Sequence, residues 1–205
     1  MSIEKVYDYF HNYDSKVYQI FACMGNEPSE KDILNFEKQY DISLPDDFKE
    51  FTMSPLGGLY MEVREELWPR AKVYDVAPFW TFCRGIMVYG IAKGIPDYLD
   101  IRVKTKELHD EGLKDYIPFF SIIGDGNTIF CFDKNNRIVV LYRYSKVAFE
   151  EDEMNFSNFL LKKIKELEER KTQMIETLEN RKKPRSAALW QLNVKKSIGV
   201  PHSDS

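Results

Sequence analysis

SEKDILNFEKQYDISLPDDFKEFTMSPLGG, residues 29–58, predicts two short helices joined by a tight corner. Ser29 and Asp32 have the spacing of a helix N-terminal cap, because each side chain can accept a hydrogen bond from a backbone N–H at the helix start. Pro45 suits the first turn of the second helix, where a backbone N–H has no intrahelical partner. The closing glycine pair ends the unit, because glycine tolerates the positive φ of a tight stop.

The apolar residues of this segment follow the spacing of two helix faces. Ile33, Phe36 and Tyr40 are three and four residues apart, which places them on one side of the first helix. Phe48 and Phe51 give the second helix a similar apolar edge. The pattern is typical of a structural core, and nothing in the segment is typical of catalysis.

The rest of the chain changes from helical to strand-like patterns and back. Strands are indicated by short runs rich in aromatic and β-branched residues, and the final helix by apolar residues three and four apart. Helices are expected at 3–23 and from Asn155 to about Leu178, a partly helical excursion at 104–115, and strands at 59–63, 79–83, 86–91, 119–123, 128–133 and 137–144. Arg84-Gly85 is expected to form one hairpin turn and residues 134–136 another.

This order of elements predicts an α+β fold, with a mostly antiparallel β-sheet flanked by N-terminal helices and a C-terminal helix. A chain of 205 residues is long enough for one domain with a substantial core plus an extension. Residues 1–170 are expected to form that domain, and residues 171–205 a helical and then flexible basic extension. The sequence leaves open whether the extension forms a dimer through the C-terminal helix or stays disordered.

Two patches of the sequence resemble the SUKH superfamily, also called the Smi–Knr family. The first patch resembles the opening helices of the family, and the second resembles its glycine-containing turn and the strand that follows. The matching positions with structural roles are Ile33, Phe36, Glu37, Leu44, Pro45, Phe48, Gly57, Gly58, Gly124, Gly126 and Asp133. The resemblance covers residues 27–168 approximately and implies the same α+β layout.

What the resemblance implies for function is a binding module rather than an enzyme. Bacterial members look like immunity proteins that bind a cognate polymorphic or contact-dependent toxin, often a nuclease, and hold it inactive. The implied partner is therefore a protein toxin domain, with no cofactor. The alternative is a regulatory scaffold or adaptor that recruits cellular proteins through the same fold, as eukaryotic relatives are thought to do.

Charge is distributed unevenly along the chain. Residues 1–161 carry 18 basic and 27 acidic side chains, a net charge of −9, whereas residues 162–205 carry 11 and 6, a net charge of +5. An acidic body favours a basic partner and makes nucleic acid an unlikely ligand, although the basic tail leaves that role open. The sequence has no transmembrane run or secretory signal, and three cysteines without metal-site spacing, so a cytoplasmic location is expected.

The sequence gives little support for a catalytic, metal-binding or phosphate-binding site. Cys83 and Cys131 lie in apolar patterns typical of buried cysteine, which argues against either as a nucleophile paired with His11 or His109. The three histidines are scattered and no glycine-rich phosphate motif is present. We therefore expect no catalytic residue, no metal and no cofactor.

Partner contacts are expected downstream of the opening helices. Glu62, Glu65, Glu66 and Asp75 suit an inhibitor of a basic toxin, although they also fit simple solvation of an acidic body. The other predicted contact residues are Trp68, Trp80 and Asp125. Tryptophan is common both in cores and at the centres of interfaces, so the sequence leaves the two tryptophans open between these roles.

Overall fold

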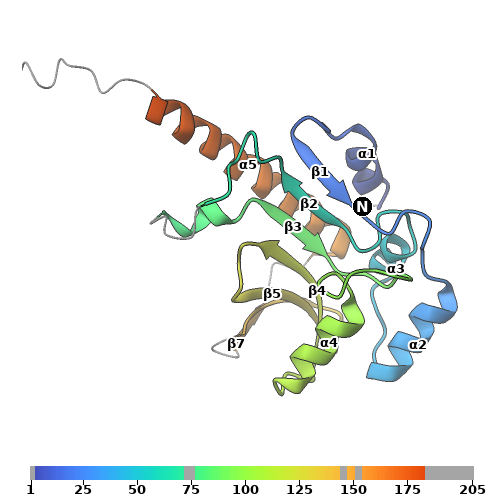
Figure 1. The fold of residues 1–205 in the computed structure, drawn as a ribbon. Helices are drawn as coiled ribbons and strands as arrows, with labels where there is room; N and C mark the ends of the chain where they lie inside the picture. The colour runs from blue at the N-terminus through green and yellow to red at the C-terminus, as the bar shows by residue number, and fades with distance from the viewer. Residues whose placement is uncertain (1–2, 72–76, 144–146, 151–153, 183–205) are drawn as a thin grey trace, which may run out of the picture.

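The computed structural model describes residues 3–71, 77–143, 147–150 and 154–182. Its elements gather around one twisted sheet (Figure 1). In chain order they are α1 (Glu4–Asn12), β1 (Tyr18–Phe21), α2 (Glu30–Tyr40), α3 (Asp46–Thr52), β2 (Tyr60–Val63), the 3-10 helix η1 (Phe79–Phe82), β3 (Gly85–Val88), α4 (Ile101–Asp110), β4 (Tyr116–Ile123), β5 (Thr128–Asp133), β6 (Ile138–Tyr142), β7 (Val147–Glu150) and α5 (Phe156–Lys182).

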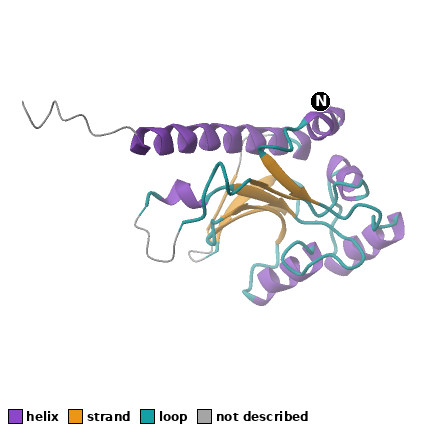
Figure 2. Cartoon of the chain, turned by 45° about the horizontal axis from the view of Figure 1, so that its top comes forward, coloured by secondary structure: helices purple, strands orange, loops and turns teal. Residues whose placement is uncertain are grey.

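The seven strands β1 to β7 lie in the sheet in the same order as in the chain, and each neighbouring pair is antiparallel. Helices fill the longer connections: α2 and α3 lie between β1 and β2, and α4 lies between β3 and β4. Helix α5 crosses one face of the sheet, and α4 packs against β4 from the opposite side (Figure 2). The predicted α+β fold with its antiparallel sheet and C-terminal helix is confirmed.

An aromatic cluster forms the core between the sheet and α5. The register of β4 against β5 shifts between Pro118 and Phe120, and such a bulge allows successive side chains to face the same way. Phe119 and Phe120 both contact Phe159 of α5, with ring centroids 5.3 and 5.1 Å apart. Phe119 also stacks on Phe132 of β5 at 4.0 Å. The bulge therefore places two adjacent large rings under one helix.

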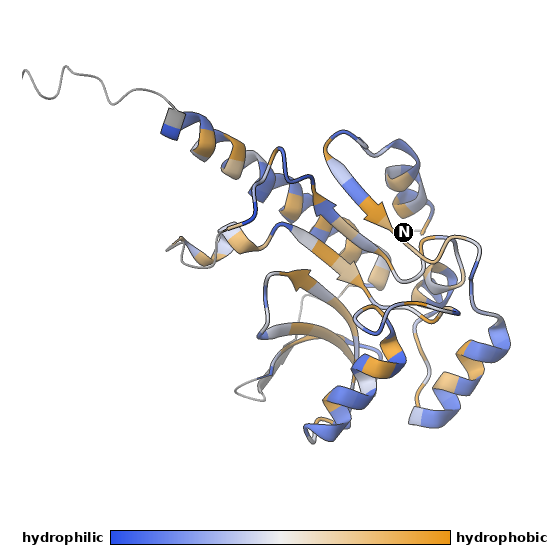
Figure 3. Ribbon diagram, in the orientation of Figure 1, coloured by the Kyte–Doolittle hydropathy of each residue, from blue (hydrophilic) through white to orange (hydrophobic). Residues whose placement is uncertain are grey.

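Orange and blue residues alternate along several helices in Figure 3, as expected for elements with one buried face.

The opening helix pair is held by polar contacts at its ends. Ser29 and Asp32 form a reciprocal capping box at the start of α2. Oε1 of Glu37, near the end of α2, accepts a hydrogen bond of 2.8 Å from the backbone N–H of Leu44, which fixes the corner into α3. Asp47 in α3 accepts hydrogen bonds from the N–H and the hydroxyl of Ser157, both at 2.9 Å, and so satisfies a donor at the start of α5.

Glycine is required at the step from α3 into β2. Gly58 has φ +66°, which is strained for other residues. A Cβ on Gly57 would lie 2.2 Å from the carbonyl oxygen of Thr52. The motif residues Ile33, Phe36, Leu44 and Phe48, which precede this step, are all buried.

The helix predicted at 3–23 is wrong beyond Asn12. Helix α1 ends there, and residues Tyr18–Phe21 form β1, which pairs with β2. The side chain of Asp14 accepts a hydrogen bond of 2.8 Å from the N–H of Lys16, a local turn that competes with helix continuation. The apolar residues after this turn suit a strand as well as a helix, and pairing with β2 decides between them.

The strand predicted at 79–83 is wrong as well, and so is the hairpin turn at Arg84-Gly85. Phe79–Phe82 form η1, in which both the N–H and the hydroxyl of Thr81 donate to the carbonyl oxygen of Pro78, at 2.9 and 2.7 Å. Proline at the start of this turn favours the tight helix. Strand β3 pairs with β2 instead, so η1 belongs to the connection between those strands.

The apolar face of α5 is used by its own domain. Phe156, Phe159, Leu160, Ile164 and Leu167 are all buried, and the helix packs on α1, α3, β3 and η1. A dimer through this helix stays a prediction, and it would have to use residues other than these.

Candidate partner-binding surface

Residues 64–84 connect β2 to β3, and the described part of this β2–β3 connection is fixed at its base by Arg84. The Arg84 guanidinium donates hydrogen bonds to Oε2 of Glu62 at 3.0 Å and to the backbone carbonyls of Trp68 and Val63 at 2.9 and 3.1 Å. Both members of the Glu62–Arg84 ion pair are buried. The side chains of Gln19 and Arg70 also contact Glu62, so its carboxylate is well satisfied.

A second clamp joins the two ends of the connection. Trp68 is 0% exposed, and its indole N–H donates to the carbonyl oxygen of Thr81 at 2.8 Å. Its ring meets Trp80 edge-on, with centroids 6.2 Å apart. Arg170 of α5 donates to the carbonyl oxygen of Cys83 at 3.1 Å, so the helix also holds the end of η1.

These contacts correct two of the predicted partner contacts. Glu62 is 2% exposed and Trp68 is fully buried, so a partner cannot reach either side chain. Glu62 pairs with Arg84, a residue 22 positions away that sequence spacing alone does not connect to it. For Trp68, the structure selects the core alternative.

Other residues of the connection lie on the surface. Glu65 and Glu66 are exposed, and Glu65 lies 3.6 Å from the guanidinium of Arg70. Trp80 is half-buried, whereas its neighbour Phe79 is 60% exposed. Phe79 is not among the contacts predicted from the sequence.

The turn that contains Asp125 lies next to η1. A Cβ on Gly124 would lie 2.1 Å from the carbonyl oxygen of Phe82, so the two backbones are in close contact. Oδ1 of Asp125 accepts hydrogen bonds from the N–H groups of Asn127 and Thr128, at 3.1 and 3.0 Å. The structure therefore brings Asp125 and Trp80 into one region, whereas the predicted contact Asp75 lies outside the described residues.

The motif residue Asp133 has a structural setting at the next turn. Its carboxylate accepts hydrogen bonds from the N–H groups of Asn135 and Arg137, at 2.8 and 2.9 Å. Partial burial raises the pKa of Asp133, but these N–H groups and the Arg137 guanidinium outweigh it, and its pKa is lowered. Asp133 thus orders the β5–β6 hairpin and stays ionised.

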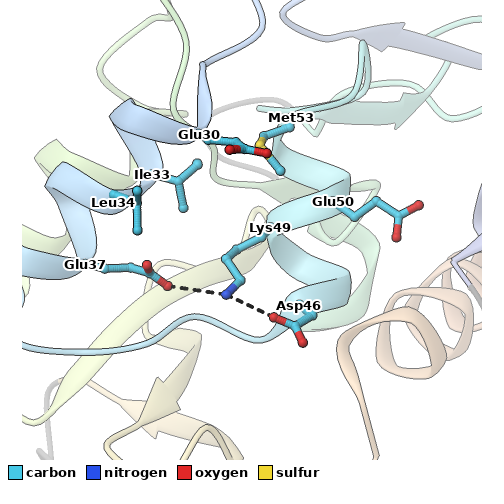
Figure 4. A pocket seen from close by; sticks show the side chains of 8 residues that line it. All are labelled: Glu30, Ile33, Leu34, Glu37, Asp46, Lys49, Glu50 and Met53. Atoms are coloured by element: carbon cyan, nitrogen blue, oxygen red, sulfur yellow. Dashed lines mark ion pairs between the residues drawn. The ribbon is translucent and has the colours of Figure 1, made fainter.

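A groove of about 310 Å³ lies between α2 and α3 (Figure 4). Ile33 and Leu34 from α2 face Lys49 of α3 and Met53, the residue that follows α3, across it. Sequence analysis missed this feature, because the helix pattern shows which residues are buried but not the space left between two helices. The available signal was Leu34, an apolar residue off the Ile33–Phe36 face.

The cysteines and histidines do not assemble into a reactive group in the described part of the chain. Cys131 is fully buried, and burial raises the pKa of its thiol. Burial also raises the pKa of the Cys83 thiol. Nε2 of His109 lies 3.2 Å from the backbone carbonyl of Tyr116. Among the described residues, no group of three or more His, Cys, Asp or Glu side chains could hold a metal ion.

Comparison with known families agrees with the fold. Residues 27–170 match the SMI1 / KNR4 family (SUKH-1), and the chain therefore belongs to this family. The resemblance that the sequence patches suggest is thus confirmed. A search of curated proteins finds no match. Within the described residues, no helix combines the length and the apolar character needed to cross a membrane.

Proposed function

We propose that this protein is an immunity protein, which binds a cognate toxin domain and holds it inactive without catalysing a reaction. The observation that carries the proposal is the described part of the β2–β3 connection, which Arg84 and Trp68 hold by hydrogen bonds and which presents an aromatic ring and two carboxylates at the surface. Phe79 is 60% exposed, with Glu65 and Glu66 on the same connection. Membership of the SMI1 / KNR4 family supports a binding role rather than an enzymatic one.

The proposed mechanism is steric and electrostatic occlusion. A large ring held in place can fill a pocket on a partner at low entropic cost, which is the usual property of an interface anchor. Carboxylates on the same connection speed the encounter with a basic surface, such as the phosphate-binding groove of a nuclease. The buried Arg84 side chain bonds the carbonyls of Val63 and Trp68 and so holds together the two described ends of the connection.

The proposed compartment is the cytoplasm. Cys23, Cys83 and Cys131 are all free thiols, which fits a reducing environment. A toxin that acts on nucleic acid would have to be bound and inhibited in that compartment.

Phe79→Ala is expected to weaken the complex with a cognate toxin domain, sought among the products of neighbouring genes, by about 30-fold, since truncation of an interface anchor costs about 2 kcal/mol or more. Titration calorimetry of the purified pair measures this change.

Glu65→Lys combined with Glu66→Lys is expected to slow association, with a reduced dependence of the rate on salt.

The matched control is Tyr98→Ala, because Tyr98 is 50% exposed but belongs to a separate surface with Phe21 and Lys93. It should leave the affinity unchanged. Equal losses for Phe79→Ala and Tyr98→Ala, or no loss for either, would rule out the β2–β3 connection as the toxin contact.

A further inference from the structure

The groove between α2 and α3 is open and largely apolar at its centre. Ile33 is buried at its base, while Leu34 is 51% exposed. Met53 lies on the α3 side, where its flexible side chain can adapt to an incoming group. The volume of about 310 Å³ is sufficient for one or two apolar side chains.

Carboxylates border this apolar centre. Glu30, Glu37, Asp46 and Glu50 all line the groove. Lys49 is the opposing charge, but its Nζ lies 2.9 Å from Asp46 and 3.7 Å from Glu37, so its charge is already balanced. In the described part of the chain, Glu30 and Glu50 form no ion pair closer than 4.0 Å. The groove is therefore net negative, with two carboxylates free to meet a cation.

We propose that the α2–α3 groove is a second docking surface, which takes a segment of a protein partner with an apolar side chain flanked by lysine or arginine. The apolar side chain would cover Leu34 and Met53, and the basic groups would reach Glu30 and Glu50. Burial of the leucine and methionine supplies the attraction, and the charges supply orientation and selectivity.

Charge argues against nucleic acid and against a second copy docked groove to groove. Nucleic acid would bring phosphates against these carboxylates and against a body of net charge −9. A second copy docked through the same groove would bring two net-negative surfaces together, because a two-fold interface joins identical patches. A basic, apolar-bearing protein segment satisfies both features of the groove.

The test is selection of a displayed library of random peptides, about a dozen residues long, against the full-length protein. We expect enriched peptides to carry an apolar residue with lysine or arginine near it. Binding of the best synthetic peptide, measured by fluorescence anisotropy, should weaken at least about tenfold in Glu30→Lys/Glu50→Lys and in Leu34→Asp. All three positions are exposed, so these variants should fold, which circular dichroism checks.

The control is Glu176→Lys/Glu179→Lys, which makes the same change in net charge at exposed positions of α5. It should bind the peptide as wild type does. The proposal is overturned by enrichment of acidic or uncharged peptides, by failure to enrich any peptide, or by binding that groove and control variants weaken equally. This test uses no toxin, so a negative result would not count against the proposed immunity function. Likewise, failure of the immunity function would not count against the groove as a docking surface.

Discussion

Replacement of Arg84 by methionine is expected to lower the free energy of unfolding by about 3–5 kcal/mol. The guanidinium of Arg84 is the buried counter-ion of Glu62, at 3.0 Å, and also donates to the carbonyls of Val63 and Trp68. Methionine removes these hydrogen bonds and leaves a carboxylate that is 2% exposed without its main partner. Urea unfolding followed by tryptophan fluorescence measures the loss.

A double-mutant cycle separates the charge from the packing. Glu62→Met alone should also destabilise, because it leaves Arg84 buried and unpaired. The double variant should lose less free energy of unfolding than the two single variants lose together, because neither charge is then left unpaired. Additive losses, or a loss below about 1 kcal/mol for Arg84→Met, would show that the pair does not hold the connection.

Phe48→Ala is expected to lower the free energy of unfolding by about 3–5 kcal/mol. Phe48 of α3 is fully buried, and its ring meets those of Phe119, Phe132 and Phe156 at centroid distances of 5.9, 5.2 and 5.0 Å. It therefore joins the opening helix pair to the sheet and to α5. Alanine would leave a cavity where three elements meet, and neighbouring rings cannot easily collapse into it.

Phe79→Ala is the matched comparison, because it removes the same ring from a position that is 60% exposed. Its stability should change by no more than about 0.5 kcal/mol. Similar losses at the two positions would mean either that Phe79 is packed rather than exposed or that Phe48 is not central to the core. The same variant then tests binding without a confounding loss of stability.

Local signals explain the parts of the fold that the sequence predicts well. The capping box at Ser29 acts within four residues, and the helix after it needs no distant partner to be recognised. The β5–β6 hairpin is predicted for the same reason, since its two strands are joined by a short turn that Asp133 orders. The order of the elements is read from the same local patterns, and the family resemblance implies the same layout.

The errors arise where distant partners decide the local structure. Residues Tyr18–Phe21 become a strand because β2, about 40 residues later, pairs with them. Phe79–Phe82 form a 3-10 helix, and the hairpin expected between this segment and the next strand is absent, because β3 pairs with β2 instead. Pattern alone does not distinguish these outcomes in short apolar runs.

The predicted contact residues also divide into those whose exposure follows from their residue type and those whose burial depends on a distant partner. Glu65 and Glu66 are exposed, as their charge suggests, whereas Glu62 is buried because its partner Arg84 is available only in the folded chain. Trp68 is buried because the carbonyl oxygen of Thr81 can accept its indole N–H. The exposure of Phe79 and of Leu34 depends on how neighbouring elements pack, and no spacing rule in the sequence reports it.

Growth of cells that express the toxin domain encoded beside this gene is the most direct test of the proposed function. Co-expression of the wild-type protein should restore growth and yield a stable complex of the two proteins on purification. Phe79→Ala should restore it less well, and Tyr98→Ala should behave as wild type. If every toxin encoded in the neighbourhood arrests growth equally with and without the protein, and none is retained by it, the immunity function is contradicted.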